Sequence, residues 1–132
     1  MAIDRVTIIN VEPPQSTDIN TELQWLGATL GLFSQRDKDS SCFRVFITLL
    51  RAAQQETALS SDEIANNCKL SRGTVVYHLN RLRETGLIEN ASEGYQLSAE
   101  SIQESIKQLE SDLNELVEIM HAVAQDIDKK LS

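Results

Sequence analysis

The sequence predicts a mainly α-helical chain that carries one small β-hairpin and ends in a long helix. Three observations favour this fold class: apolar residues recur at helical spacing in several segments, a glycine-containing turn separates two short apolar runs, and the C-terminal apolar residues alternate at spacings of four and three. The chain has 132 residues, 41% hydrophobic side chains and a net charge of −8, which favours one folded domain over a disordered chain.

Charge divides the chain into three parts. Residues 1–39, an expected N-terminal arm and helix, carry 3 basic and 6 acidic side chains, residues 40–98 carry 6 and 6, and residues 99–132, an expected C-terminal helix, carry 3 and 8. The acidic total argues against indiscriminate binding of polyanions. Four basic side chains fall between residues 69 and 83, so only this stretch is expected to meet a phosphate backbone.

The N-terminal residues and the two cysteines indicate the compartment. The first ten residues contain Asp4 and lack the apolar core of a signal peptide, and no apolar run approaches the roughly 18 to 20 residues of a membrane span. A cytoplasmic protein without membrane contact is therefore expected. Cys42 and Cys68 lack the spacing of paired metal ligands and are too few for a disulfide framework. We expect two buried thiols, with a redox pair as the alternative.

The N-terminal part is expected to hold an extended segment and one helix. Residues 5–11 alternate apolar and polar side chains and stop at Pro13-Pro14, which indicates a short strand or an extended arm. Residues 16–18 can cap a helix that contains Gly27 and Gly31 and whose apolar face is formed by Leu23, Leu26, Leu30 and Phe33. Residues 35–40 form a charged connector to the central part.

The central part is expected to begin with two helices. Ser40 or Ser41 can cap the first helix, which runs to about Gln55. Its apolar face is formed by Phe43, Phe46, Ile47 and Leu50. Ser60 and Glu63 have the spacing of a capping box, in which each side chain bonds to the backbone amide of the other residue. This box predicts a very short second helix over residues 61–67.

A third helix and a hairpin complete the central part. Ser71 can cap this helix, whose apolar face is formed by Val75, Leu79 and Leu82, and Gly86 marks its end. The tight segment 68–70 joins it to the preceding helix. Residues 87–90 and 95–97 are expected to form the two strands of a hairpin around a turn at residues 91–94, in which Gly94 supplies the turn residue.

The C-terminal part has the pattern of a helical seam. Its apolar residues fall at the two core positions of four heptads: Ile102, Ile106, Leu109, Leu113, Leu116, Met120, Val123 and Ile127. A single helix of this length spans about 45 Å and cannot be buried by the preceding residues alone. We therefore expect these eight side chains to mediate self-association. His121 beside the seam is expected at the surface or in the interface rather than in a ligand set.

The most specific signal lies within residues 42–98. The chain resembles the winged helix-turn-helix of prokaryotic transcription regulators, most closely the ArsR-like group and similar archaeal regulators. The resemblance is carried by Glu63-Ile64-Ala65, Leu70-Ser71, Thr74-Val75, His78-Leu79, Leu82 and Gly86-Leu87-Ile88. The hairpin corresponds to the wing, and residues 72–80 resemble the archaeal regulators in particular. The resemblance implies a sequence-specific regulator that binds double-stranded DNA. A homodimer would read a palindromic operator whose half-sites lie about 10 bp, or a multiple of that, apart.

Helical geometry selects the candidate DNA contacts. At about 100° per residue, Gly73, Thr74, Tyr77 and Arg81 point away from the apolar face, so the polar side is available to bases and phosphates. The candidate DNA-binding residues are Ser71, Arg72, Gly73, Thr74, Tyr77, His78, Arg81 and Arg83. Arg72 can reach a guanine edge or a phosphate, and Arg81 and Arg83 better suit phosphates. His78 either contacts DNA or bonds locally.

The acidic wing and the acidic C-terminal helix favour an alternative function. The wing contains Glu89 and Glu93 and no Lys or Arg, whereas a wing in the minor groove profits from a cation. Either the wing adds little to DNA affinity, or the module is a protein-interaction adaptor that uses its acidic C-terminal helix.

The sequence contains no catalytic constellation, phosphate-binding loop or metal quartet, so neither an enzyme nor a cofactor is expected. The paired cysteines of ArsR-like metal sensors are replaced by the lone Cys68, and a possible effector ligand stays unidentified.

Overall fold

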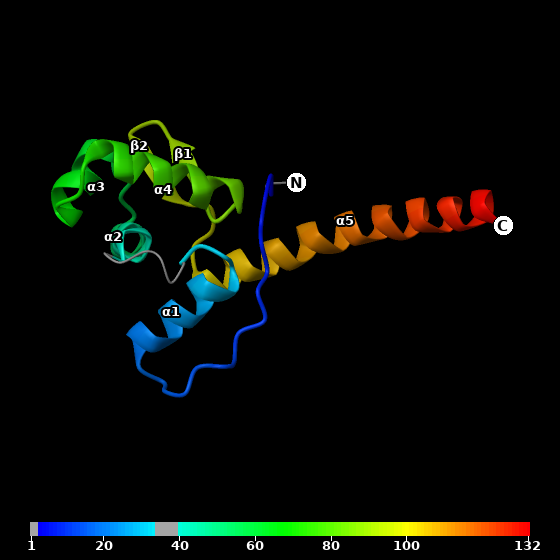
Figure 1. Ribbon diagram of the computed structural model, residues 1–132. Coiled ribbons are helices and arrows are strands. Elements are labelled where there is room, and N and C mark those ends of the chain that lie inside the picture. The colour runs from blue at the N-terminus through cyan, green and yellow to red at the C-terminus, as the bar shows by residue number, and fades with distance from the viewer. Residues whose placement is uncertain (1–2, 34–39) are drawn as a thin grey trace.

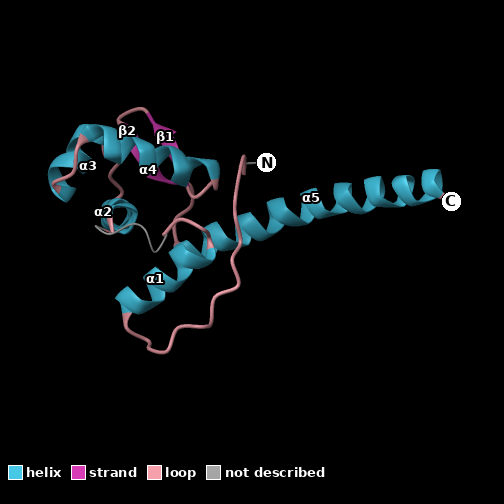
Figure 2. Ribbon diagram, viewed as in Figure 1, coloured by secondary structure: helices cyan, strands magenta, loops and turns pink. Residues whose placement is uncertain are grey.

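The computed structural model describes residues 3–33 and 40–132 (Figure 1). In these residues the elements are, in chain order, α1 (Ile19–Thr29), α2 (Ser41–Gln54), α3 (Ser61–Cys68), α4 (Arg72–Glu84), β1 (Ile88–Ala91), β2 (Gly94–Leu97) and α5 (Ile102–Leu131). Helices dominate, and a two-stranded antiparallel hairpin follows α4 (Figure 2). The predicted fold class is confirmed: the chain is a winged helix with a long C-terminal helix.

The core lies between α2, α3 and α4. Its largest fully buried side chains include Val45, Leu49, Ile64, Val75, Leu79 and Leu82, so the predicted apolar face of α4 is confirmed. Of the predicted apolar face of α2, Phe46 is buried in the core as expected, but the other three residues are not. Cys42, Val45 and Leu49 point into the core, whereas Phe43, Ile47 and Leu50 are half-buried at its margin. The Phe43 and Phe33 rings pack edge to face at 5.5 Å between centroids, which explains why α2 is apolar on two sides.

Most of the predicted helix caps form. Asp18 accepts a hydrogen bond from the Thr21 amide at the start of α1, the Ser60–Glu63 capping box is complete at the start of α3, and Ser71 caps α4. The expected serine cap of α2 is wrong. Ser40 adopts a left-handed conformation and makes no side-chain cap bond, while the hydroxyl of Ser41 is bonded to His78.

The helix expected to reach Phe33 ends at Thr29 instead. Gly31 has φ +67°, a conformation that turns the chain out of the helix. The amides of Leu32 and Phe33 then both donate to the carbonyl of Gly27. This turn places the Phe33 ring against Gly27, where a Cβ would overlap it. The predicted charged connector falls on residues 35–40, of which 35–39 lie outside the described residues.

Residues 5–11 form the extended arm rather than the strand that was the alternative expectation. The amides of Asp4 and Arg5 donate to the carbonyl of Glu84 at the end of α4, and the amide of Ile9 donates to Thr29 at the end of α1. The arm therefore satisfies helix carbonyls that lack a partner within their own helix, instead of pairing with a strand.

The hairpin pairs Ile88 with Leu97 and Ala91 with Gly94, which confirms the predicted wing. One contact of the wing was not predicted: Leu59, before α3, forms an isolated antiparallel bridge with Tyr95 of β2. Gly94 has φ +148°, and a Cβ on it would overlap the carbonyl of Leu59. This close approach ties the wing to the segment that precedes α3.

The helix α5 has 30 residues and two different halves. In the first half Leu109 is buried in the core, and Ile102, Ile106 and Leu113 pack partly against it, so their own chain buries the first of these seam residues and half-buries the other three. The expectation that the whole seam awaits a partner was therefore wrong for this half. Every residue from 114 to 132 is exposed, and this half projects from the body (Figure 1). In the described part of the chain, no helix is long and apolar enough to cross a membrane.

The close approach at Gly94 makes a stability prediction. Gly94→Ala is expected to lower the free energy of unfolding by about 2 kcal/mol or more, because the new Cβ strikes backbone and the φ angle disfavours it. Gly73→Ala is the matched control. Its Cβ would meet nothing within 4 Å among the described residues, so stability should rise by up to about 1 kcal/mol. Urea denaturation followed by circular dichroism measures both, and a Gly94→Ala variant as stable as wild type would contradict the account.

Candidate nucleic-acid interface

The helices α3 and α4 are joined by a tight turn that is bonded to α2. Lys69 ends α3 in a left-handed conformation with φ +55°, and the amide of Leu70 donates to Ala65 at 3.1 Å. The guanidinium of Arg44 on α2 donates to the carbonyl of Cys68. Cys68 and Cys42 are both buried, as predicted. The crossing of the two helices is therefore held by packing and by a bond to the turn itself.

The first two turns of α4 present an open polar surface, which we call the recognition face and define as Ser71, Arg72, Gly73, Thr74 and Tyr77. Four of these residues are exposed, and Thr74 is half-buried. The Tyr77 side chain is 60% exposed, although large apolar rings are usually covered. A Cβ on Gly73 would meet no described atom within 4 Å. The backbone at this point is therefore open to close approach by a ligand.

The two polar groups at the start of α4 differ in how firmly they are held. The Ser71 hydroxyl accepts from the Thr74 amide at 3.2 Å and donates to the Thr74 hydroxyl at 2.8 Å, so both are engaged in the cap. Arg72 lies 3.6 Å from Asp62 of α3, and both side chains are more than 70% exposed. Such an exposed ion pair is worth little. Arg72 is therefore able to exchange Asp62 for a phosphate or a base edge.

His78 is placed inside the protein rather than on the recognition face. It is 6% exposed, and its Nε2 shares a hydrogen bond of 2.8 Å with the hydroxyl of Ser41. The bond joins the middle of α4 to the first residue of α2. This geometry favours the local-bond alternative for His78 and removes it from the candidate DNA contacts.

Arg81 and Arg83 also bond to other elements. Arg81 donates to the carbonyl of Gly31 at 2.8 Å, beside the end of α1, and its guanidinium carbon lies 5.8 Å from the centre of the Tyr77 ring. Arg83 donates to Asn80 at 2.9 Å and to Asn90 of β1 at 3.2 Å. The first arginine ties α4 to α1 and the second ties it to the wing. Of the two, only Arg83 remains on the exposed surface.

Sequence reasoning passed over one exposed polar residue next to the recognition face. Lys69, which belongs to the predicted basic stretch, lies in the turn immediately before α4, but Asn80, which follows Tyr77 by three residues on the same side of the helix, was not predicted. The spacing 73, 77 and 80 is that of one helical face and could have identified Asn80.

The wing is acidic and internally bonded. Glu89 accepts from Gln96 across the two strands at 3.0 Å, and Glu93 lies exposed in the turn between β1 and β2. Arg83 of α4 donates a hydrogen bond to Asn90 of β1. The wing therefore offers carboxylates, and no cation of its own, to any nucleic acid beside it.

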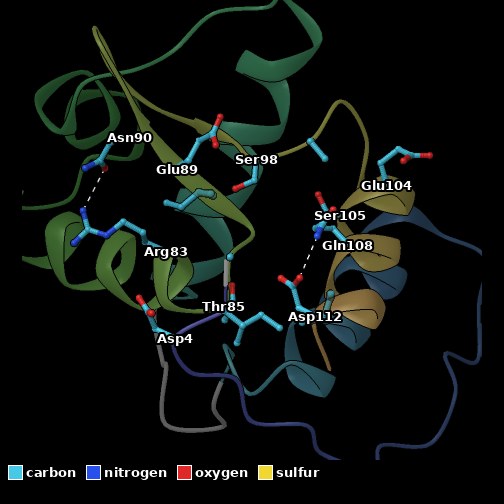
Figure 3. A pocket seen from close by; sticks show the side chains of 15 residues that line it. Asp4, Arg83, Thr85, Glu89, Asn90, Ser98, Glu104, Ser105, Gln108 and Asp112 are labelled. Atoms are coloured by element: carbon cyan, nitrogen blue, oxygen red, sulfur yellow. Dashed lines mark hydrogen bonds between the residues drawn. The ribbon is translucent and has the colours of Figure 1, made fainter. Parts of the chain in front are cut away.

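A cavity of about 470 Å³ with polar and apolar lining residues lies between the end of α4, the wing and α5. Figure 3 shows Arg83 and Asn90 on one side of it and Ser105, Gln108 and Asp112 on the other. Asp112 is 3% exposed and accepts from Gln108 at 3.1 Å. The cavity therefore touches the recognition helix, the wing and the C-terminal helix at once.

The comparison with protein families agrees with this geometry. Residues 39–90 match the family model of a helix-turn-helix domain, a range that contains α2, α3, α4 and most of β1. Comparisons with curated proteins and with solved structures give no significant match. The match thus supports a helix-turn-helix DNA-binding domain over residues 39–90.

Proposed function

We propose that the protein is a sequence-specific regulator of transcription that binds double-stranded DNA as a homodimer. The observation that carries the proposal is the division of α4: one side is fully buried through Val75, Leu79 and Leu82, and the opposite side of its first two turns is exposed and polar. A recognition helix needs such a division, because it must be held rigidly while its N-terminal residues enter the major groove.

The recognition face fits both kinds of DNA contact. Arg72 can bond in a bidentate manner to guanine or hold a phosphate, and Tyr77 can bond to bases or backbone. The amides of the first turn that are not used by the Ser71 cap can receive a phosphate. Lys69, exposed just before α4, adds a second cation at the same end. The resemblance to ArsR-like regulators supports this placement.

The homodimer is supported by the second half of α5. Its exposed large apolar side chains are Leu116, Val117, Ile119, Met120, Val123, Ile127 and Leu131. Monomeric proteins rarely leave so many on one element. A twofold dimer would present two recognition helices to a palindromic operator. Only the outer seam residues Leu116, Met120, Val123 and Ile127, with Leu113 at their margin, are proposed to form this interface, because Ile102, Ile106 and Leu109 contact their own chain.

The adaptor is the second candidate, and the acidic wing is the observation that favours it. An adaptor would use the winged domain as a scaffold and dock a partner on α5. The two functions differ in salt dependence. A protein that neutralises several phosphates loses affinity for duplex DNA steeply with added salt, whereas apolar helix pairing responds little.

Removal of the Arg72 guanidinium tests the recognition face. Arg72→Ala is expected to weaken binding to an operator duplex by about 1 to 3 kcal/mol, at one base position if Arg72 contacts a base and for all sequences alike if it holds a phosphate. Arg51→Ala removes the same charge from a groove between α1, α2 and α5 and should change affinity little. Fluorescence anisotropy over a salt series measures both. Equal losses for the two variants, or no loss for Arg72→Ala, would sink the assignment.

Charge reversal tests the wing. Glu93→Lys should tighten DNA binding, because it replaces repulsion from the phosphates with attraction, and the gain should shrink as salt rises. Glu12→Lys makes the same charge change on the exposed segment before α1 and serves as the control. If Glu93→Lys leaves affinity unchanged while the control behaves as expected, the wing does not lie near DNA.

A buried charge in the seam tests whether dimerisation and DNA binding are coupled. Leu116→Asp should dissociate the dimer and abolish operator binding together, because an unpaired carboxylate is costly in an apolar interface. Gln125→Asp adds the same charge on the opposite side of α5 and should leave both intact. Analytical ultracentrifugation gives the mass and anisotropy the affinity. A Leu116→Asp monomer that still binds the operator tightly would break the proposed coupling.

A further inference from the structure

The exposed apolar residues of α5 form one continuous stripe. At about 100° per residue, the seven large side chains from Leu116 to Leu131 fall within roughly 160° of the helix circumference. They are each between 42% and 80% exposed. Glu118 and Gln125 lie on the opposite side of the helix. The stripe is therefore the part of α5 that a partner would cover.

Charge is distributed unevenly along the same helix. Residues 110–118 carry four acidic side chains, Glu110, Asp112, Glu115 and Glu118, and no basic one. The two lysines of this half, Lys129 and Lys130, lie at the other end of the stripe. Lys130 ion-pairs with Asp126 at 2.8 Å and stands at a seam position, where apolar residues precede it. The two ends of the stripe are therefore different in charge.

We propose that α5 pairs with α5 of a second copy in the antiparallel direction, with the twofold axis between His121 and Ala122. This inference rests on the proposed homodimer and adds its orientation. In this register Met120 packs beside the partner's Val123, Leu116 beside the partner's Ile127, and Leu113 beside the partner's Lys130, each contact occurring twice. Both core positions of the heptad are then filled by apolar side chains in the central layers.

Charge selects this orientation over the parallel one. Parallel helices in register would place the acidic stretch 110–118 beside its own copy and would put Lys130 directly opposite Lys130, so that like charges repel at both ends. Antiparallel helices bring Lys129 and Lys130 level with the acidic stretch of the partner instead. The carbon chain of Lys130 can cover Leu113 while its ammonium reaches the partner's carboxylates. Antiparallel macrodipoles also attract.

The exposed length fits the same arrangement. Leu113, where α5 leaves the body, is half-buried, and every later residue is exposed. In the proposed register the C-terminal end of α5 in one copy lies beside Leu113 of the partner, where the partner's own chain begins to cover its α5. The starts of the two helices are then about 60 Å apart, whereas parallel pairing would place them about 10 Å apart. The two winged domains therefore lie at opposite ends, and operator half-sites separated by more than one turn of DNA are expected.

Introduced cysteines distinguish the orientations. The variants Leu116→Cys and Ile127→Cys are purified separately, oxidised alone and as a mixture, and analysed by non-reducing gel and mass spectrometry. In the antiparallel dimer the two copies of position 116 are about 16 Å apart along the axis, too far for a disulfide, while positions 116 and 127 meet. Wild-type protein, whose Cys42 and Cys68 are buried, controls for cross-links through native thiols.

The expected result is a disulfide-linked 116–127 heterodimer in the mixture and several-fold less cross-linking in either variant alone. Efficient cross-linking of each variant with itself would overturn the antiparallel orientation and leave the homodimer standing. A dimer by ultracentrifugation that forms no cross-link in any sample would overturn the register. A monomeric wild-type protein at micromolar concentration would overturn the homodimer together with its orientation. DNA binding by the winged domain would then be tested separately by the Arg72→Ala variant.

Discussion

The burial of one side of α4 is the constraint on which the rest of the structure depends. Val75, Leu79 and Leu82 are completely covered, and each such side chain contributes about 1.5 to 3 kcal/mol when it is buried. Because a helix is rigid, fixing this side also fixes the direction of Arg72 and Tyr77 on the other. The core therefore positions the recognition face from the opposite side of the helix.

Polar bonds add direction to this packing. His78 bonds to α2, Arg81 to the end of α1 and Arg83 to the wing, so α4 is held to three neighbouring elements by named hydrogen bonds. Three of the eight candidate DNA contacts thus have a structural task. They hold α4 in place, and the residues nearest its N-terminus stay open for a ligand. Specificity in this account comes from Arg72, Thr74 and Tyr77, and affinity from the cations at the same end of the helix.

Local signals in the sequence predicted the elements well, and long-range contacts explain what they missed. The Ser60–Glu63 box, the Ser71 cap and the Gly94 turn act within a few residues, so their spacing was sufficient. The buried bond of His78 depends on Ser41, which lies 37 positions away, and the bridge of Leu59 depends on Tyr95. The heptad pattern of α5 predicted a continuous seam, but a repeating pattern does not reveal which side chains meet their own core. The rest of the chain buries Leu109, partly covers Ile102 and Ile106, and leaves the residues after Leu113 exposed.

Selection of the purified protein against a random library of DNA duplexes, at near-physiological salt, tests the central claim most directly. The account predicts enrichment of a palindromic sequence, with half-sites read by the two recognition faces and separated by more than one helical turn. Failure of a folded protein to enrich any sequence would contradict sequence-specific DNA binding by α4, and would favour the adaptor that docks a partner on α5.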